Sequence, residues 1–362
     1  MDLKLTPLFE KHRKLGARLA PFGGWLMPIQ YTGIIAEHNW TRRSASIFDI
    51  CHMGEFIIYG EPKKSNLERL LTIGLAGMSC GACRYGFMLN EKGGIIDDLI
   101  VYRIKQNEWM LVVNAAFTGR DESHLRKYLS CDSKLENISA KSGKIDLQGP
   151  ISQDVLKELV GSEIDELKYY TFALFSILGE ESIVSRTGYT GELGYEVYLS
   201  NEKIKELWNI LLKDKRVKPA GLGARDTLRL EIGYPLYGQD INEDITPLEA
   251  GLERFVDFNK NFIGRDSLIE KKKRGITKML VCFMTNTRRA PRHNYKIYDG
   301  DKEIGFVTSG SFSPTLSCGI GMGYVKSEYG KNGTKIILKE NKIEINATVT
   351  DRPFYKKGSA RS

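Results

Sequence analysis

The sequence lacks any long apolar segment. No run approaches the roughly 18 apolar residues that a membrane-spanning helix requires, and residues 172–178 form one of the longest. The first seven residues, MDLKLTP, contain neither an apolar signal region nor an arginine-rich presequence. We therefore expect no membrane association and a chain that stays where it is made, in the cytoplasm.

Residues that bind metals are sparse and scattered. The six cysteines are mostly isolated in apolar surroundings, as expected in a reducing compartment. Cys80 and Cys83 form a CxxC motif, but no second CxxC and no pair of histidines follows at zinc-ligand spacing. A thioredoxin-type site would need the motif to open a helix, whereas a glycine-rich connection leads here into a strand-like segment. We expect neither a metal centre nor a redox function.

Nucleotide and nucleic-acid sites are also poorly supported. The GLGARD sequence at 221–226 suggests a dinucleotide-binding loop, but Asp226 stands where the third glycine belongs and no strongly apolar strand precedes it. It is better interpreted as the start of a helix with Arg225 at its entrance. The net charge of +8 allows an acidic partner. However, the basic groups at 271–274 and 288–292 lack the interleaved aromatic residues of a single-strand binder, so we expect no nucleic-acid partner.

The distribution of periodic segments predicts the domain organisation. A chain of 362 residues exceeds one ordinary core. Helix-like and strand-like segments mix over residues 1–274, which we divide approximately near 52 and 140, and residues 275–362 predict an all-β domain. Its expected strands are 279–284, 295–298, 304–308, 321–325, 335–338 and 343–349. Capping and periodicity predict helices at 6–20, 33–43, 62–72, 116–129 and 246–252.

Two adjacent carboxylates, Asp97 and Asp98, stand at the entrance of a run rich in Ile, Leu, Val and Tyr. Burying an unpaired carboxylate costs several kcal/mol or raises its pKa, so these acids need a partner or a task. Since successive strand side chains point to opposite faces, at most one of them faces any given site. The residues alone leave two possibilities open: a turn at Gly93 and Gly94 with the acids bonding loop amides, or a catalytic site.

Two further polar residues end or interrupt strand-like segments. Residues 108–114 predict a buried strand that pairs with 95–104 across a hairpin, and Asn114 at its end either binds a ligand or caps the next helix. Alternation within 194–199 places Glu196 on the face opposite its immediate neighbours, beside a glycine-rich loop. Glu196 is therefore a carboxylate held on a strand-like segment, next to a flexible loop.

Seven motifs, in order along the chain, resemble the aminomethyltransferase or T-protein family of the glycine cleavage system. Each motif is weak alone, but together they extend almost from end to end. They are FGGWLMP at 22–28, FD at 48–49 with HMGE at 52–55, GGIIDDLIVY at 93–102, TGYTGE at 187–192, GLGARD at 221–226, YGQD at 237–240 and TSGSFSPTL at 308–316.

The resemblance implies an α+β, three-domain cloverleaf with a barrel-like all-β C-terminal domain and tetrahydrofolate bound near its centre. It also implies a reaction, in which the aminomethyl carbon on the lipoyl arm of H-protein is transferred to tetrahydrofolate. The products are 5,10-methylenetetrahydrofolate, ammonia and a dihydrolipoyl arm. Tetrahydrofolate is then the acceptor substrate, lipoylated H-protein is the partner, and no metal is required.

The resemblance further implies roles for individual residues. Asp98 matches the essential carboxylate near the reacting folate nitrogens, where it would orient N5, assist proton transfer and stabilise developing positive charge. Glu196 matches the carboxylate that accepts from the pterin N3 proton and 2-amino group, and Arg225 matches the binding arginine of the family. The other positions that resemble folate-contacting residues are Tyr85, Asn114, Tyr169, Tyr189 and Tyr355.

Two other kinds of protein provide alternatives, the first of them from the same superfamily. A folate-binding iron–sulfur assembly factor would carry Lys-Gly-Cys-Tyr before Gly-Gln-Glu, whereas this chain has YPLYGQD at 234–240 without that cysteine. A demethylase module would accompany a flavin-binding half, which the sequence does not show. We therefore predict the aminomethyltransferase.

Overall fold

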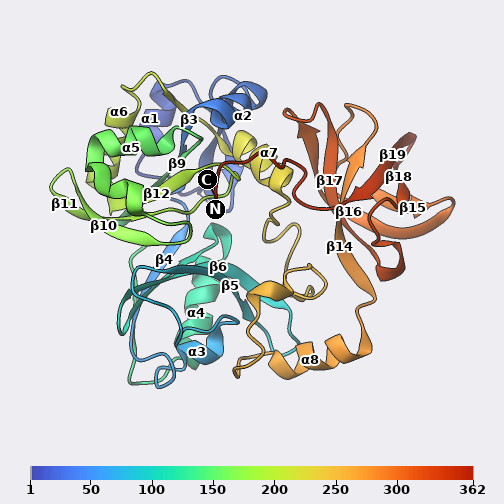
Figure 1. The fold of residues 1–362 in the computed structure, drawn as a ribbon, viewed down its shortest axis with the longest axis horizontal. Helices are drawn as coiled ribbons and strands as arrows, with labels where there is room; N and C mark the ends of the chain where they lie inside the picture. The colour runs from blue at the N-terminus through green and yellow to red at the C-terminus, as the bar shows by residue number, and fades with distance from the viewer. Residues whose placement is uncertain (1, 362) are drawn as a thin grey trace.

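The computed structural model describes residues 2–361, which form three lobes (Figure 1). Its strands build a six-stranded sheet, a five-stranded sheet, a closed six-stranded barrel and a two-stranded hairpin. With the helices between them these give the predicted α+β fold with an all-β C-terminal barrel. No helix among the described residues is long and apolar enough to cross a membrane.

The first lobe is built on the six-stranded sheet, whose strand order is β10-β11-β12-β9-β3-β13. The chain leaves this sheet after β3, builds the second lobe, and returns with β9, which pairs antiparallel with both β3 and β12. Helices α5 and α6 cover one face. The bounds are β3 (Ala45–Asp49), β9 (Ser142–Gln148), α5 (Ser152–Val160), β10 (Phe172–Ile177), β11 (Glu180–Ser185), β12 (Gly194–Ser200), α6 (Asn201–Leu211) and β13 (Val217–Pro219).

The second lobe is the five-stranded antiparallel sheet, in the order β5-β6-β7-β4-β8. The predicted hairpin between β6 and β7 is confirmed. Leu99 and Val101 on β6 pack into the core beneath α4, while Ile100 and Tyr102 lie on the other face. The bounds are β4 (Gly54–Tyr59), α3 (Leu67–Leu70), β5 (Cys83–Leu89), β6 (Ile95–Lys105), β7 (Glu108–Val113), η1 (Ala115–Phe117), α4 (Thr118–Tyr128) and β8 (Lys134–Asn137).

The third lobe is the barrel, closed in the order β14-β17-β16-β15-β18-β19. All six strands expected from the sequence are present, and their inward side chains form a separate core. The bounds are β14 (Lys278–Thr285), β15 (Lys296–Asp299), β16 (Lys302–Ser313), β17 (Cys318–Lys326), η4 (Ser327–Tyr329), β18 (Lys335–Glu340) and β19 (Ile343–Thr350).

The remaining elements complete the first lobe, as α2 does, or connect the lobes (Figure 1). Helix α7 lies between the first lobe and the barrel in Figure 1 and contacts both α2 and β16. The bounds are α1 (Phe9–Lys14), β1 (Arg18–Phe22), β2 (Trp25–Gln30), α2 (Ile34–Arg43), η2 (Ser162–Glu166), α7 (Leu222–Ile232), η3 (Glu253–Phe255) and α8 (Arg265–Arg274).

Three predicted helices were wrong in extent or type. The helix expected at 6–20 is only α1, because Thr6 donates to Asp49 Oδ2 at 2.6 Å instead of capping a helix, and Gly16 ends it at a φ of +69°. The helix expected at 62–72 is reduced to α3. Residues 246–252 form turns and no helix, because Gly251 at a φ of +64° ends the segment after a single turn.

Candidate active site

Polar residues of the first two lobes meet where their sheets face each other. The contact layer contains Tyr102 and Met110 of the second lobe with Phe172 and Tyr198 of the first. The Tyr102 hydroxyl lies 2.9 Å from the Tyr198 hydroxyl and donates to Glu196 Oε2 at 3.3 Å. The contact therefore joins β6, which carries Asp98, to β12, which carries Glu196.

Asp98 is held by two neighbouring side chains and remains partly exposed. The Tyr85 hydroxyl donates to Oδ2 at 2.8 Å, and Asn114 Nδ2 donates to Oδ1 at 2.8 Å. Burial, together with the adjacent charge of Asp97, raises the pKa of Asp98 to about 7, although the two hydrogen bonds oppose this rise. A carboxyl group with a pKa near neutrality is suited to take and return a proton.

Asp97 points to the opposite face and is fully buried. Its oxygens accept from Asn114 N at 3.0 Å and Asn114 Nδ2 at 2.8 Å. Burial and the neighbouring Asp121 raise the pKa of Asp97 well above its ordinary value. The predicted separation of the two aspartates onto opposite faces is confirmed. The Asn114 side chain does not cap η1, because its amide donates hydrogen bonds to both aspartates instead.

Glu196 lies opposite its neighbours on β12, as alternation predicted, and is 4% exposed. Oε2 accepts from Thr187 Oγ1 at 2.8 Å and lies 3.6 Å from Lys144 Nζ. Burial raises the pKa of a carboxyl group, but Lys144, Thr187 and Arg225 outweigh it and hold the pKa of Glu196 below its ordinary value. Within residues 2–361 the hydrogen bonds to Glu196 all reach Oε2, which leaves Oε1 able to accept from a ligand.

Arg225 belongs to the same group. From the first turn of α7 its Nη1 donates to Asp146 Oδ2 at 2.5 Å, and its guanidinium lies 5.1 Å from the centre of the Tyr189 ring. Asp146 is the direct cross-strand neighbour of Glu196. Two carboxylates and two cations, Glu196 with Lys144 and Asp146 with Arg225, thus form one buried cluster.

Sequence reasoning missed Lys144 and Asp146. The alternation KIDLQ at 144–148 does place their side chains on the face opposite Ile145 and Leu147, but nothing in that pattern says that this face meets Glu196. The neighbouring glycine also has a role here. A Cβ at Gly194 would lie 2.0 Å from Gln148 Nε2, and that amide donates to Asp146 Oδ1 and to Thr187 O.

Tyrosines line the approach to these groups. Tyr189 stacks on Tyr234 with ring centres 5.7 Å apart, and its hydroxyl donates to Pro235 O. Burial raises the pKa of Tyr189, the charge of Asp98 adds to this rise, and Arg229 and Arg225 oppose it. Tyr169 packs edge-on against Tyr170, with ring centres 4.9 Å apart.

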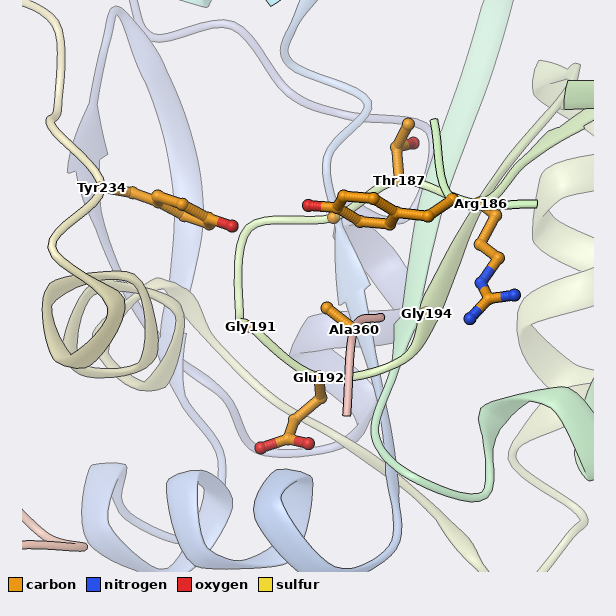
Figure 2. Close-up of a pocket in the computed structure, with 9 residues that line it drawn as sticks. Arg186, Thr187, Gly191, Glu192, Gly194, Tyr234 and Ala360 are labelled. Carbon is orange, nitrogen blue, oxygen red and sulfur yellow. The ribbon is translucent and has the colours of Figure 1, made fainter. Parts of the chain in front are cut away.

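A shallow hollow lies beside the glycine-rich loop (Figure 2), and within the described chain it encloses no space large enough for a water molecule. Thr187, which donates to Glu196, lines it, as do Tyr169 and Tyr234. The C-terminal segment reaches its rim, where Ala360 N donates to Gly191 O at 3.2 Å. The hollow therefore adjoins the Glu196 group and has aromatic walls.

Tyr355 lies elsewhere. Its ring packs 4.3 Å from the guanidinium of Arg42, and its backbone N donates to Glu231 O at 2.9 Å. Of the eight predicted site residues, the structure joins Asp98, Tyr85 and Asn114 in one group and Glu196 and Arg225 in another. Tyr189 packs against Arg225, and Tyr169 lies at the hollow. The structure places Tyr355 on Arg42. Among residues 2–361, no three His, Cys, Asp or Glu side chains are grouped to hold a metal ion.

Comparisons with known proteins identify the family. Residues 8–260 match the GCVT N-terminal domain, and residues 278–356 match the glycine cleavage T-protein C-terminal barrel domain. An aminomethyltransferase of Halothermothrix orenii is 45% identical over 97% of this chain and 100% of its own. Another, of Caldanaerobacter subterraneus subsp. tengcongensis, is 43% identical over 98% of this chain and 97% of its own.

A solved structure agrees with these sequences. The crystal structure of glycine cleavage system aminomethyltransferase T from Bartonella henselae superimposes with a TM-score of 0.93, at 34% identity, over 99% of both chains. Every one of these relatives covers nearly the whole of this chain, including the strands that carry Asp98 and Glu196. This chain belongs to the glycine cleavage T-protein family of aminomethyltransferases.

Proposed function

We propose that this protein transfers the aminomethyl carbon from the lipoyl arm of H-protein to tetrahydrofolate. The observation that carries the proposal is the pair of carboxyl groups on facing strands. Glu196 is held in the ionised form by Lys144, while the pKa of Asp98 lies near neutrality. One acid is suited to bind a ligand and the other to move a proton.

The residues present fit a pterin. A pterin presents its N3 proton and 2-amino group side by side, and an ionised carboxylate accepts both. Glu196 provides such a carboxylate, with Oε1 free of other hydrogen bonds from the described chain. Tyr189 and Tyr169 provide flat apolar walls for the ring and its extension. Arg225, anchored by Asp146, fixes the wall next to Tyr189.

Asp98 performs the proton chemistry in this proposal. Tetrahydrofolate supplies the nitrogen nucleophile when bound. The Asp98 carboxylate stabilises the positive charge that develops as ammonia leaves, and it accepts a proton from the reacting centre. Tyr85 and Asn114 each donate to one of its oxygens, so the carboxylate keeps a fixed orientation.

We place the reaction in the cytoplasm and assign no nucleic-acid partner. The six cysteines have no disulfide partners, which supports a reducing compartment. The alternative, a folate-binding iron–sulfur assembly factor, has no support from the named relatives, all of which are aminomethyltransferases.

The deciding experiment supplies aminomethylated, lipoylated H-protein and measures 5,10-methylenetetrahydrofolate and ammonia, with and without tetrahydrofolate. We expect stoichiometric formation of both products only when tetrahydrofolate is present. Binding of tetrahydrofolate without product formation would contradict the transferase and favour a folate-binding assembly factor.

A further inference from the structure

Two charged residues behind the proposed folate site carry a further inference. Lys144 and Asp146 lie on β9, with Asp146 directly opposite Glu196 in the sheet, and they share a face with it. Ile145 and Leu147 between them point into the core of the first lobe. Lys144 is 1% exposed and Asp146 is fully buried, so neither is a solvated surface charge.

Each of these charged residues pairs with an oppositely charged residue that has a role in the proposed function. Lys144 Nζ lies 3.6 Å from Glu196 Oε2. Asp146 Oδ2 accepts from Arg225 Nη1 at 2.5 Å. Buried charges are costly unless they are paired, and removing one partner leaves the other uncompensated. The two pairs are therefore mutually dependent, and both touch the pterin site from behind.

We propose that Lys144 and Asp146 are positioning residues for folate: Lys144 keeps Glu196 ionised with Oε1 free for the pterin, and Asp146 orients Arg225. This inference rests on the proposed function and names the residues that hold its folate-binding groups, Glu196 and Arg225, in place. Neither side chain contacts the reacting atoms, so both act through the residue that they hold.

The physical reason is the burial of Glu196. Desolvation favours the protonated form of a carboxyl group that is only 4% exposed, and Lys144 is the largest of the contributions that oppose it. A protonated carboxyl group has one oxygen that donates, so it cannot accept two N–H groups side by side. Without Lys144, Glu196 is expected to bind a proton in place of the pterin.

Other ionisable groups also face Glu196. Burial raises the pKa of Asp146, and it raises the pKa of Glu55 on β4 to about 8. Neither oxygen of Glu55 has a hydrogen-bond partner within the described chain. The remaining groups near this cluster are Tyr102 on β6, Tyr198 on β12, Cys83 on β5, Arg225 on α7, Tyr170 and His52. Lys144 also lowers the pKa of Glu55, Asp146, Cys83 and His52, so the pH profile is assigned to Glu196 only if it is absent when Lys144→Met is made together with Glu196→Gln.

The test measures the Kd of tetrahydrofolate by calorimetry between pH 6 and 9 for the unmodified protein and for Lys144→Met. We expect binding about tenfold weaker at pH 7, with a ratio of the two Kd values that falls as pH rises. The fall is expected because deprotonation of Glu196 restores the paired acceptor. A ratio of one, or a ratio that does not change with pH, would overturn the inference.

A double-variant cycle keeps the test independent of folding. If Lys144 acts through Glu196, then Lys144→Met adds no further loss of affinity to Glu196→Gln. The double variant removes both charges and leaves neither unpaired in the interior, so it is expected to fold even where Lys144→Met does not. Additive losses would contradict a positioning role. Absence of tetrahydrofolate binding by the unmodified protein would instead overturn the proposed function itself.

Tyr195→Phe is the matched control. Tyr195 precedes Glu196 on β12 but points to the opposite face, and its buried hydroxyl has no hydrogen-bond partner among residues 2–361. We expect an unchanged Kd at every pH. For the second pair, Asp146→Asn is expected to raise the KM for tetrahydrofolate severalfold with little change in kcat, because Arg225 loses its charged anchor. A fall in kcat alone would contradict that assignment.

Discussion

At the scale of residues, Asp97 and Asp98 are neighbours in sequence with different surroundings. Asp97 is buried and faces the core side of β6, whereas Asp98 is partly exposed and lies on the other face of the strand. Asn114 bonds both acids, with its Nδ2 at 2.8 Å from one oxygen of each. The same amide therefore fixes the orientation of the proposed catalytic acid and satisfies the acid behind it.

Asp98→Asn is expected to lower kcat by about 100-fold or more, which is the usual size of a lost proton-transfer group. The Kd of tetrahydrofolate is expected to stay nearly constant, because Glu196 and the tyrosines are intact. Asp97→Asn is the comparison: it is expected to lower the free energy of unfolding by roughly 1–3 kcal/mol through unmatched hydrogen bonds. Steady-state kinetics and denaturant unfolding of both variants measure this, and a fully active Asp98→Asn protein would contradict the proposed role.

The pH dependence of the reaction follows from the raised pKa of Asp98. The carboxylate is the form that stabilises positive charge, and a pKa of about 7 means that it is replaced by the neutral acid below neutrality. We therefore expect kcat/KM to rise with pH to a plateau, with a midpoint near 7. The residual activity of the Asp98→Asn variant is expected to show no such rise with pH. An identical profile in the variant would assign the titration to another group.

At the scale of elements, alternation along strands was predictable and contacts between strands were not. The two faces of β6 and of β12, and all six barrel strands, follow from local residue patterns. The cluster of Lys144 with Glu196 depends on the pairing of β9 with β12, a register that no local pattern encodes. Short helices were also overestimated, because the competing contact of Thr6 with Asp49 is formed by distant parts of the chain.

The turn that leads into β6 gives a prediction at this scale. Gly93 has a φ of +81°, and a Cβ on Gly94 would lie 1.8 Å from the backbone oxygen of Glu243. Gly94→Ala is therefore expected to separate β6 from the segment at 242–245 and to lower the free energy of unfolding by roughly 2–4 kcal/mol. Thermal and denaturant unfolding measure the loss.

Gly119→Ala is the control for that substitution. Gly119 lies in α4 without a positive φ, and a Cβ there would have no neighbouring atom within 4 Å outside its own helix backbone and chain neighbours. Alanine is therefore expected to be neutral or to stabilise by up to about 1 kcal/mol. Equal stability of Gly94→Ala and Gly119→Ala would show that the close approach to Glu243 is not a real constraint.

At the scale of the whole molecule, α7 joins the lobes through buried charges. Glu231 accepts from Arg42 of the first lobe at 2.8 Å and from Thr315 Oγ1 of the barrel segment at 2.9 Å. Near the same end of the helix, Arg229 donates to Ser309 Oγ of the barrel at 2.8 Å. Since Arg225 of the proposed folate site lies on the same helix, docking of the barrel and orientation of the site are mechanically connected.

Arg229→Met tests this connection. Arg229 is 1% exposed and lies 2.8 Å from Asp240, which is equally buried. Its loss leaves that carboxylate without a cation, and breaking a buried pair in this way costs about 3–5 kcal/mol. We expect a lower Tm and, because Asp240 also accepts from Ser309 on β16, barrel unfolding that precedes that of the other two lobes.

The exposed pair of Arg126 with Glu122 on α4 provides the contrast for this measurement. Arg126→Met removes the same kind of side chain from a solvated ion pair, and such pairs contribute about 0–1 kcal/mol. Unfolding followed by tryptophan fluorescence reports on the first two lobes, because all four tryptophans, at 25, 40, 109 and 208, precede the barrel, and circular dichroism reports on every lobe. In Arg229→Met the circular dichroism signal is expected to change first, at a lower denaturant concentration than the fluorescence. Coincident transitions with an unchanged midpoint would mean that Arg229 does not hold the barrel against α7.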